Sequence, residues 1–299
     1  MKNTVYFLLG LSFFLLSFMY AVGQEKKRQP LYSKNNLVAW CVVPFDKMKR
    51  NPEQRAAMMK ELGITQLAWD WRDEHLPLME EEIKTLRKNN IKLKSVWFWV
   101  NGGEGKVMDE ANHFILKTLK DNNVKTELWL SFNDRYFEGL SDSGKLTKAV
   151  SAVGEINRRA REIGCTVHLY NHGSWFGEPE NQVRIIEALG TKNIGIVYNF
   201  HHARHQVNEF PRLLQIMKPY LSTVNINGMK DGGPMIVTVG QGNRELTMLQ
   251  QLKDSGYQGS IGVLSHVDDE DAKVVLARNL EGLKMLLKKM GDSRALKTY

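Results

Sequence analysis

One pattern of apolar and polar positions repeats along the chain: an amphipathic segment with helical spacing, a Gly or Asn stop, and then a short apolar run. Gly and Asn suit the left-handed residue that closes a helix. The runs that follow are rich in β-branched and aromatic residues, as strands are. The stops and the runs after them read KELG-ITQLAWD, RKNN-IKLKSVWFWV, KDNN-VKTELWLSF, REIG-CTVHLYN, EALG-TKNIGIVYN and KDSG-YQGSIGVLS.

The repeat predicts eight strands, each followed by a helix. The strands are expected to begin near Leu37, Ile64, Lys92, Thr126, Thr166, Ile194, Thr223 and Ile261. The helices are expected near Pro52, Leu76, Met108, Gly144, Pro179, Glu209, Arg244 and Asp268. Strict alternation predicts a parallel sheet, and eight units predict its closure into a single-domain (β/α)8 TIM barrel over residues 37–290. The alternative is an open doubly wound sheet, but the segment VVPFDKMKRNPEQ after the first strand has no GxGxxG phosphate loop.

The two ends of the chain differ from the barrel. Lys2 precedes an apolar run from Val5 to Met19, and Ala21-Val22-Gly23 then offers the small residues at which a signal peptidase cleaves. The run is shorter than the roughly 20 residues of a membrane span. We therefore expect export to the periplasm or the exterior, with no membrane association after cleavage. The expected segments are a signal peptide at 1–23, a polar leader at 24–36 and a C-terminal tail at 291–299.

The charge pattern argues against a nucleic-acid partner, and the two cysteines fit the barrel core. The formal net charge is +8, but the basic residues alternate with acids in helix-like stretches such as LMEEEIKTLRKNN and INRRAREIG. Such stretches form solvated helix faces, so no nucleic-acid partner is expected. Cys41 and Cys165 lie in apolar, strand-like segments, and we interpret them as small buried hydrophobic residues.

Alternation along each strand sorts side chains between the helix layer and the barrel interior. Val224 and Ile226, for example, should face the helices, which turns Asn225 and Asn227 inward. The side chains expected inside are His168, Tyr170 and His172; Glu127, Trp129, Ser131 and Asn133; Val197, Asn199 and His201; and Thr223, Asn225 and Asn227. Buried polar groups cost ~1–3 kcal/mol each unless paired, so their concentration at the carboxyl ends of the strands indicates a functional site. Glu127 and His168 lie deeper, and the sequence leaves open whether they are structural or functional.

All seven tryptophans lie in or just after predicted strands, where flat apolar rings beside polar groups suit a sugar. Core filling accounts equally well for any one of them. They are Trp40, Trp69, Trp71, Trp97, Trp99, Trp129 and Trp175. We take Trp99, and Asp70 after the second strand, as candidate substrate contacts.

Several segments carry a family resemblance. They read LYNHGSWFGEPEN, VYNFHHARH, VNINGMKDGG, VGQGNRELTMLQQLKDSGYQGSIGVL and NLEGLKMLL. They resemble a branch of the xylose-isomerase-like barrels, a superfamily of sugar-phosphate isomerases and epimerases that shares its fold with the second apurinic-endonuclease family. The resemblance runs from about Leu37 to Leu287 and is tightest from Val167 to Leu264. It implies a sugar substrate and an enediolate stabilised by a divalent metal, which a Glu–Asp–His–Glu set on strands five to eight would hold.

Each of those metal positions differs in this chain. The resemblance places them on Tyr170, Asn199, Asn225 and Ser265, the last beside His266. Tyr and Asn are neutral at pH 7 and are poor ligands for Mn²⁺ or Mg²⁺. No metal cofactor is therefore expected. Asn171-His172 and His202 do match the family, in which the second histidine contacts substrate.

We expect an exported enzyme that acts on a free sugar or keto-sugar by removing a proton next to a carbonyl, in an isomerisation, epimerisation or β-elimination. The expected catalytic residues are His172, His202 and Glu178, the last held in the GEPEN loop between Gly177 and Pro179. The expected substrate contacts are Tyr170, Asn171, Asn199, His201, Asn225, Asn227, His266, Trp99 and Asp70. One alternative is a carbohydrate-binding barrel without catalysis. The other is a metalloenzyme whose ion, such as Zn²⁺, is held by His172, Glu178, His202, His205 and His266.

Overall fold

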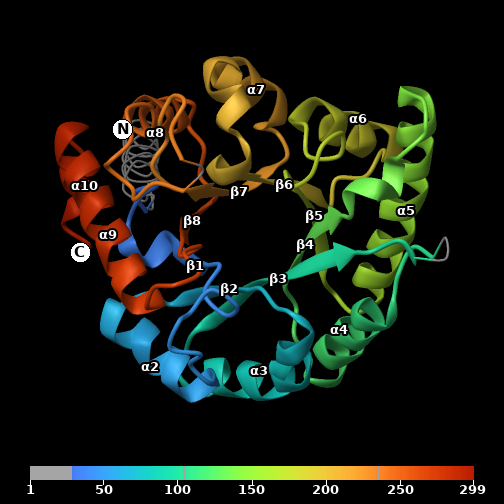
Figure 1. The fold of residues 1–299 in the computed structure, drawn as a ribbon, viewed down its shortest axis with the longest axis horizontal. Helices are drawn as coiled ribbons and strands as arrows, with labels where there is room; N and C mark the ends of the chain where they lie inside the picture. Colours follow the sequence, from blue (N-terminus) through green and yellow to red (C-terminus); the bar gives the residue numbers. More distant parts are fainter. Residues whose placement is uncertain (1–28, 104–105, 235) are drawn as a thin grey trace, which may run out of the picture. The chain divides into compact units, whose positions relative to one another are not determined.

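Eight parallel strands form a closed ring in the computed structural model, which describes residues 29–103, 106–234 and 236–299 (Figure 1). Each strand pairs with its neighbours in sequence, and β1 closes the ring on β8 with Leu37 opposite Ile261. The strands are β1 Leu37–Trp40, β2 Gln66–Trp69, β3 Lys92–Val100, β4 Glu127–Phe132, β5 Thr166–Tyr170, β6 Ile194–Asn199, β7 Leu221–Ile226 and β8 Ser260–Leu264. The expected (β/α)8 barrel is confirmed.

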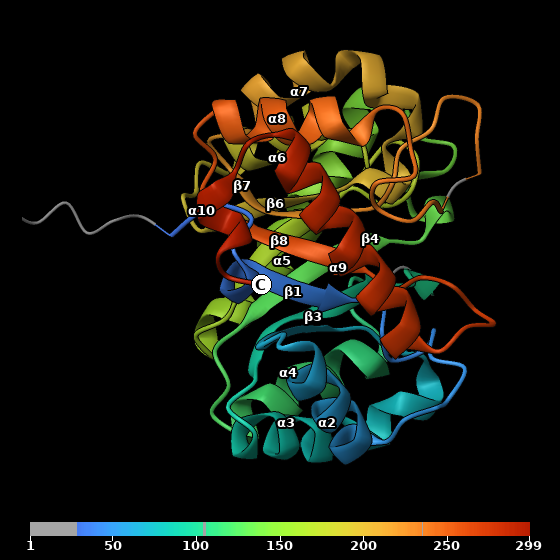
Figure 2. The same cartoon turned by 90° about the vertical axis from the view of Figure 1, so that its left-hand side faces the viewer.

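Helices surround the ring, and Figure 2 shows them outside the strands from the side. The α-helices are α2 Pro52–Leu62, α3 Met79–Lys88, α4 Glu110–Asp121, α5 Asp142–Glu162, α6 Pro179–Leu189, α7 Phe210–Met217, α8 Glu245–Asp254, α9 Ala272–Lys289 and α10 Ser293–Leu296. Short 3-10 helices lie at η1 Lys34–Asn36, η2 Asp73–Leu78, η4 Asp134–Phe137, η5 Phe200–His202 and η6 Arg204–Glu209.

The predicted boundaries agree closely with the structure. Every strand begins within two residues of its expected start. Helix α2 begins at Pro52 because Asn51 caps it, accepting a hydrogen bond from the Gln54 backbone nitrogen at 2.9 Å. The largest shift is at α9, expected near Asp268. It begins at Ala272 because Asp271 is the capping residue and accepts a hydrogen bond from the Lys273 nitrogen at 2.8 Å.

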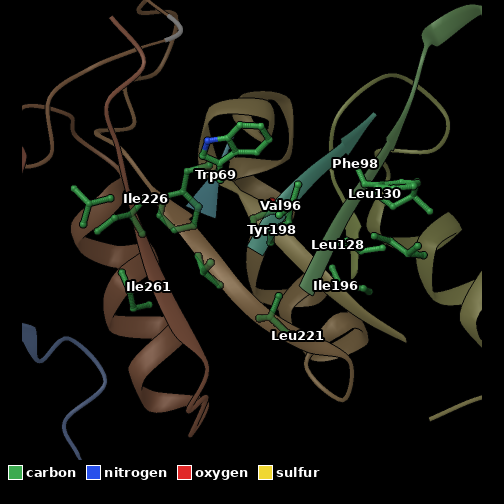
Figure 3. Packing of buried hydrophobic residues seen from close by; sticks show 14 of the residues in the cluster. Trp69, Val96, Phe98, Leu128, Leu130, Ile196, Tyr198, Leu221, Ile226 and Ile261 are labelled. Carbon is green, nitrogen blue, oxygen red and sulfur yellow. The ribbon is translucent and has the colours of Figure 1, made fainter. Parts of the chain in front are cut away.

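Two separate apolar clusters confirm the predicted alternation of the strands. The outer cluster packs strands against helices and includes Leu128, Leu130, Phe132, Val167, Leu169, Ile196, Tyr198, Val224 and Ile226 (Figure 3). The inner cluster fills the barrel and includes Trp40, Cys41, Trp129, Tyr170 and Val197. Val224 and Ile226 pack in the outer cluster, as expected, and Asn225 and Asn227, on either side of Ile226 in the sequence, are buried. Cys41 and Cys165 are both buried and free.

Residues assigned to the two ends pack onto the barrel where the structure describes them. Tyr32, expected in the leader, is fully buried, and its hydroxyl donates to the Leu249 carbonyl at 2.6 Å. The expected tail contains α10 and ends at Tyr299, whose hydroxyl donates to the Tyr32 carbonyl at 2.9 Å. The expected signal peptide at 1–23 lies outside the described residues. No helix in the described ranges combines the length and apolar character needed to cross a membrane.

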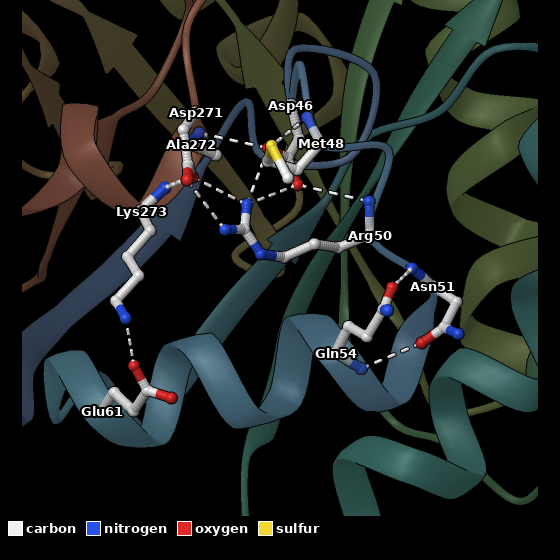
Figure 4. Close-up of polar contacts among 9 residues, drawn as sticks. All are labelled: Asp46, Met48, Arg50, Asn51, Gln54, Glu61, Asp271, Ala272 and Lys273. Carbon is white, nitrogen blue, oxygen red and sulfur yellow. Dashed lines mark hydrogen bonds and ion pairs between the residues drawn. The ribbon is translucent and has the colours of Figure 1, made fainter.

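A buried ionic network fixes the loop between β1 and α2 (Figure 4). Arg50 donates to both carboxylate oxygens of Asp46, at 2.8 and 2.9 Å, and to Asp271 at 3.0 Å. The Asp46 side chain is fully buried and also accepts from the Ala272 backbone nitrogen at 3.2 Å. The first loop of the barrel is thereby tied to the start of its last large helix, α9.

Candidate active site

A cavity of about 130 Å³ lies at the carboxyl ends of the strands, where barrel enzymes hold their sites. Its walls come from β1, β2, β3, β5, β6 and β8 or from the residues just after them. The lining residues are Trp40, Cys41, Phe45, Asp70, Arg72, Trp97, Tyr170, His172, Asn199, His201, His202 and His266. The structure thus brings together seven of the residues expected from the sequence: Asp70, Tyr170, His172, Asn199, His201, His202 and His266.

Tyr170 and Asn199 form a fixed polar wall of the cavity. The Tyr170 hydroxyl accepts hydrogen bonds from Trp40 Nε1 at 3.3 Å and from Asn199 Nδ2. Because both of these groups donate, the Tyr170 proton can be donated to a ligand. Burial raises the pKa of Tyr170, so its hydroxyl is neutral. Asn171 holds this wall in place, because its Oδ1 accepts from the Asn199 backbone nitrogen at 2.7 Å and its Nδ2 donates to the Asn199 carbonyl at 3.1 Å.

Four histidines form a contiguous cluster around the cavity. Ring centroids lie 4.7 Å apart for His172 and His202, 4.5 Å for His201 and His202, and 5.1 Å for His201 and His266. Burial lowers the pKa of His172 and of His266. Burial, with the neighbouring imidazoles, lowers the pKa of His202 to about 2. These three rings are therefore neutral at pH 7 and can each donate one hydrogen bond and accept one.

Asp70 is the one carboxylic acid among the described residues that line the cavity. Its side chain is almost completely buried, with 2% of the residue exposed. Oδ1 accepts from the Val43 backbone nitrogen at 3.3 Å, whereas Oδ2 has no hydrogen-bond partner among the described residues. Burial raises the pKa of Asp70 to about 6. A buried carboxyl group with a free oxygen and a pKa near neutrality suits proton transfer.

Arg72 supplies positive charge at the edge of the cavity. Its guanidinium lies over the rings of Phe45 at 5.2 Å and Trp97 at 5.5 Å, measured to the ring centroids. Its Nη1 donates to the Trp71 carbonyl at 2.8 Å. Arg72 is thus held by stacking and by a backbone contact, with its charge available to an anion that forms in the cavity.

Glu178 does not line the cavity. It is the residue before α6, and its carboxylate accepts from Gln206 Nε2 at 2.6 Å and contacts His205 Nε2 at 2.9 Å. The 3-10 helix η6 therefore draws Glu178 away from the histidine cluster. Asn225 and Asn227 are buried but line neither the cavity nor another described pocket, and Trp99 borders a neighbouring hollow.

Glu127 and His168 belong to a network deep in the barrel, away from this cavity. Glu127 pairs with Lys94 and accepts from Trp129 Nε1 at 3.1 Å, while His168 contacts Thr166 Oγ1 at 3.0 Å and Ser222 Oγ at 2.5 Å. Burial opposes the ionisation of Glu127, but His168 and Lys94 outweigh it and lower the pKa of Glu127. These contacts favour a structural role. A larger, open hollow of about 620 Å³ borders His168, but it lies at the amino-terminal ends of β5 and β6 and holds none of the expected site residues.

The positions at which the family holds its metal do not fit a hard cation. Tyr170 already accepts two hydrogen bonds, Asn225 is a neutral amide, and Ser265 is a neutral hydroxyl. In the described part of the chain, no group of three or more His, Cys, Asp or Glu side chains is arranged to hold a metal ion. The expected histidine-rich set is also divided, since Glu178 and His205 contact each other outside the cavity.

Sequence reasoning missed five residues that line the cavity: Trp40, Cys41, Phe45, Arg72 and Trp97. Most belong to β1–β3 or the loops after them, outside the segments that carry the resemblance most strongly. The strand-end rule could have found Arg72, which comes three residues after the end of β2. The same rule applies to Cys41, which directly follows β1, but its left-handed backbone, with φ of 55°, shows only in the structure.

The closed eight-strand ring and the cavity at its carboxyl end define the class of fold: the chain is a (β/α)8 TIM barrel, similar to solved structures of xylose isomerase-like TIM barrel proteins. Among similar solved structures, the 3-keto-D-glucoside 4-epimerase YcjR of E. coli is 17% identical, covers 86% of this chain and 99% of its own, and has a TM-score of 0.63. The IolI protein with a bound zinc atom is 15% identical, and the match covers 85% of this chain and 98% of IolI, with a TM-score of 0.65. A D-tagatose 3-epimerase-like protein is 16% identical, and the match covers 86% of this chain and 98% of that protein, with a TM-score of 0.61. At these identities the likeness establishes the fold.

Sequence comparison adds little beyond the fold. No protein-family model matches the chain. The uncharacterized protein MJ1311 of Methanocaldococcus jannaschii is 24% identical over 120 residues, which are 38% of this chain. The match spans 41% of that relative's length.

Proposed function

We propose that the protein is an exported enzyme of the sugar isomerase and epimerase type, acting on a free sugar or keto-sugar by proton transfer next to a carbonyl. The observation that carries the proposal is Asp70, a buried carboxyl group with one unpartnered oxygen, in a cavity walled by aromatic rings and neutral histidines. Sugar epimerases with the same fold support the substrate class.

Asp70 acts as the general base in this proposal. With a pKa of about 6 it is mostly ionised at pH 7, yet basic enough to take a proton from a carbon next to a carbonyl. The electron pair of the broken C–H bond forms a C=C bond, and the π pair of the carbonyl group moves to its oxygen, which gives an enediolate. If Asp70 returns the proton to the neighbouring carbon, the product is an isomer. An epimer forms when a second acid on the opposite face of the enediolate protonates the original carbon, and the N–H groups of His172 and His202 are the candidates for that acid.

Neutral donors stabilise the enediolate oxygen in place of a metal. The Tyr170 hydroxyl and one N–H of His172 or His202 can each donate to that oxygen, and the Arg72 guanidinium adds positive charge. In a buried site such donors act most strongly where charge develops in the transition state. No step of the proposal uses a metal.

Solvent-exchange measurements test the proposal. The purified protein is incubated in D₂O with a panel of free sugars and 3-keto-sugars, and NMR follows deuterium entering the carbon next to the carbonyl. We expect exchange with at least one sugar, at a rate that rises with pH through about 6. Asp70→Asn should lower that rate by about 10²–10⁴-fold. Asn keeps the oxygen that accepts from the Val43 nitrogen, so the fold should persist.

Two further variants complete the test. Glu162→Gln removes an exposed carboxylate that forms an ion pair with Arg158 across one helical turn, and it should leave exchange unchanged. Glu178→Gln tests the acid/base expected from the sequence, and its position outside the cavity predicts a small effect. If Glu178→Gln abolishes exchange and Asp70→Asn does not, Asp70 is not the base. If sugars bind but no sugar exchanges, the chain is a carbohydrate-binding barrel without catalysis.

A further inference from the structure

A second, larger hollow of about 590 Å³ adjoins the cavity and shares two of its residues, Arg72 and Trp97. Its other lining residues are Trp71, Asp73, Glu74, Trp99, Asn101, Asp109 and Ala111. We call this hollow the tryptophan groove. A ligand that fills the cavity can therefore continue past Arg72 and Trp97 without leaving the protein surface.

The length of β3 places two indoles along this path. At nine residues, β3 is the longest strand of the barrel, and it carries Trp97 and Trp99 on either side of Phe98. Phe98 packs in the outer cluster, so alternation turns both tryptophans toward the cavity side. Their ring centroids lie 5.4 Å apart, and both rings are partly exposed. The Trp99 ring also lies 5.4 Å from the ring of His172, which lines the cavity.

The polar rim of the groove selects against an anion. Asp73, Glu74 and Asp109 place three carboxylates around it, against the single guanidinium of Arg72. These carboxylates can accept hydrogen bonds from hydroxyl groups but repel a phosphate. Asn133 donates to Asn101 Oδ1 at 3.1 Å and so fixes the Asn101 amide, whose NH₂ group can donate to a ligand. Flat aromatic faces with hydroxyl-binding groups at the edge match a neutral sugar ring.

We propose that the tryptophan groove binds the second ring of a neutral two-ring glycoside whose first ring, the reacting keto-sugar, occupies the cavity. This inference rests on the proposed function and names its substrate class. The groove, at about 590 Å³, has room for a further sugar ring beside the cavity of about 130 Å³. The larger binding surface thus lies beside the chemistry, where it can position the sugar without touching the reacting atoms.

The test compares two-ring and one-ring substrates. The 3-keto forms of maltose and cellobiose are measured against 3-keto-glucose, with deuterium exchange giving kcat/KM for each. Wild-type protein should prefer a two-ring substrate. Trp99→Ala should lower kcat/KM for that substrate by about tenfold, mainly through KM, because a stacked aromatic contact is lost. The loss with 3-keto-glucose, which lacks the second ring, should be clearly smaller.

Two variants guard against indirect effects. Asn101→Ala leaves the contact between Trp99 and His172 in place. It should also reduce kcat/KM selectively for the two-ring substrate. Trp175→Ala removes a tryptophan that donates to Asp142 and lines neither hollow, so it should leave the preference unchanged. Equal loss for one-ring and two-ring substrates in both groove variants would overturn the inference while leaving the proposed function intact. If no substrate exchanges, calorimetry with maltose and cellobiose decides: binding that Trp99→Ala weakens supports the groove and defeats only the catalytic proposal.

Discussion

At the scale of single residues, the raised pKa of Asp70 affects both the proposed catalysis and the stability of the fold. Burial raises its pKa from 3.8 to about 6 in the folded chain. Between these pH values the folded chain holds a proton that the unfolded chain has released, so stability falls as the pH rises through this window. At pH 7 the loss is complete, at 1.36 kcal/mol per pKa unit or about 3 kcal/mol. The side chain best suited to proton transfer therefore destabilises the fold.

This linkage predicts that Asp70→Asn stabilises the protein while removing activity. The melting temperature should rise by several degrees at pH 7, since Asn is neutral and keeps the contact with the Val43 nitrogen. The gain should shrink toward zero by pH 4, where the wild-type carboxyl group is protonated. Thermal unfolding at the two pH values measures both quantities, with Glu162→Gln as the reference variant. A gain of the same size at both pH values would show that the charge is not its cause.

Glu178 shows what sequence cannot supply at this scale. The GEPEN loop lies at the start of a helix, where Glu178 is the residue before α6. The direction of its side chain depends on His205 and Gln206, which reach it from η6, 27 and 28 residues later in the chain. No local pattern reports that contact, whereas strand alternation turned Tyr170, Asn199 and His201 inward, and all three line the cavity.

At the scale of elements, the loop between β1 and α2 depends on the partly buried guanidinium of Arg50. Arg50 neutralises Asp46, whose side chain is fully buried. Replacing Arg50 by Met should lower the free energy of unfolding by about 3–5 kcal/mol, because it leaves a buried carboxylate without its cation. Urea denaturation measures the change.

The matched control is Lys273→Met, at a residue drawn in the same close-up (Figure 4). It breaks the ion pair with Glu61, in which both side chains are largely exposed, and should cost less than about 1 kcal/mol. Similar losses in both variants would mean that the Asp46 network contributes no more than a surface pair. This network could not be predicted from sequence, because Arg50 and Asp271 are 221 residues apart and meet only when the barrel closes.

At the scale of the whole molecule, local signals were enough to define the barrel. Helix stops located the starts of six of the eight predicted strands. With eight strand–helix units predicted, closure into a barrel was the simplest arrangement. The candidate site was predictable only in part, because the family resemblance is strongest after Val167, while Phe45, Arg72 and Trp97 reach the cavity from the first three units. Their place follows from closure of the ring and from loop conformation, neither of which a periodic pattern encodes.

The altered metal positions lead to a prediction for the intact protein. Purified protein should carry no stoichiometric divalent metal by elemental analysis, and a chelator should leave deuterium exchange unchanged. The reason is the loss of carboxylates at Tyr170, Asn199 and Ser265, which removes the charge that a hard cation needs. One tightly bound ion per chain, together with loss of exchange on chelation, would contradict this. His172 and His202 would then be the first ligands to replace.

The clustering of aromatic rings also makes the molecule its own optical probe. Five of the seven tryptophans belong to one set of neighbouring rings, from Trp129 and Trp40 inside the barrel to Trp97, Trp71 and Trp99 along the groove. Excitation absorbed by one indole can pass to its neighbour over such distances, and water reaching any of them shifts the emission. The intrinsic fluorescence is therefore dominated by the region we assign to the substrate, and a colourless sugar can be followed without a label.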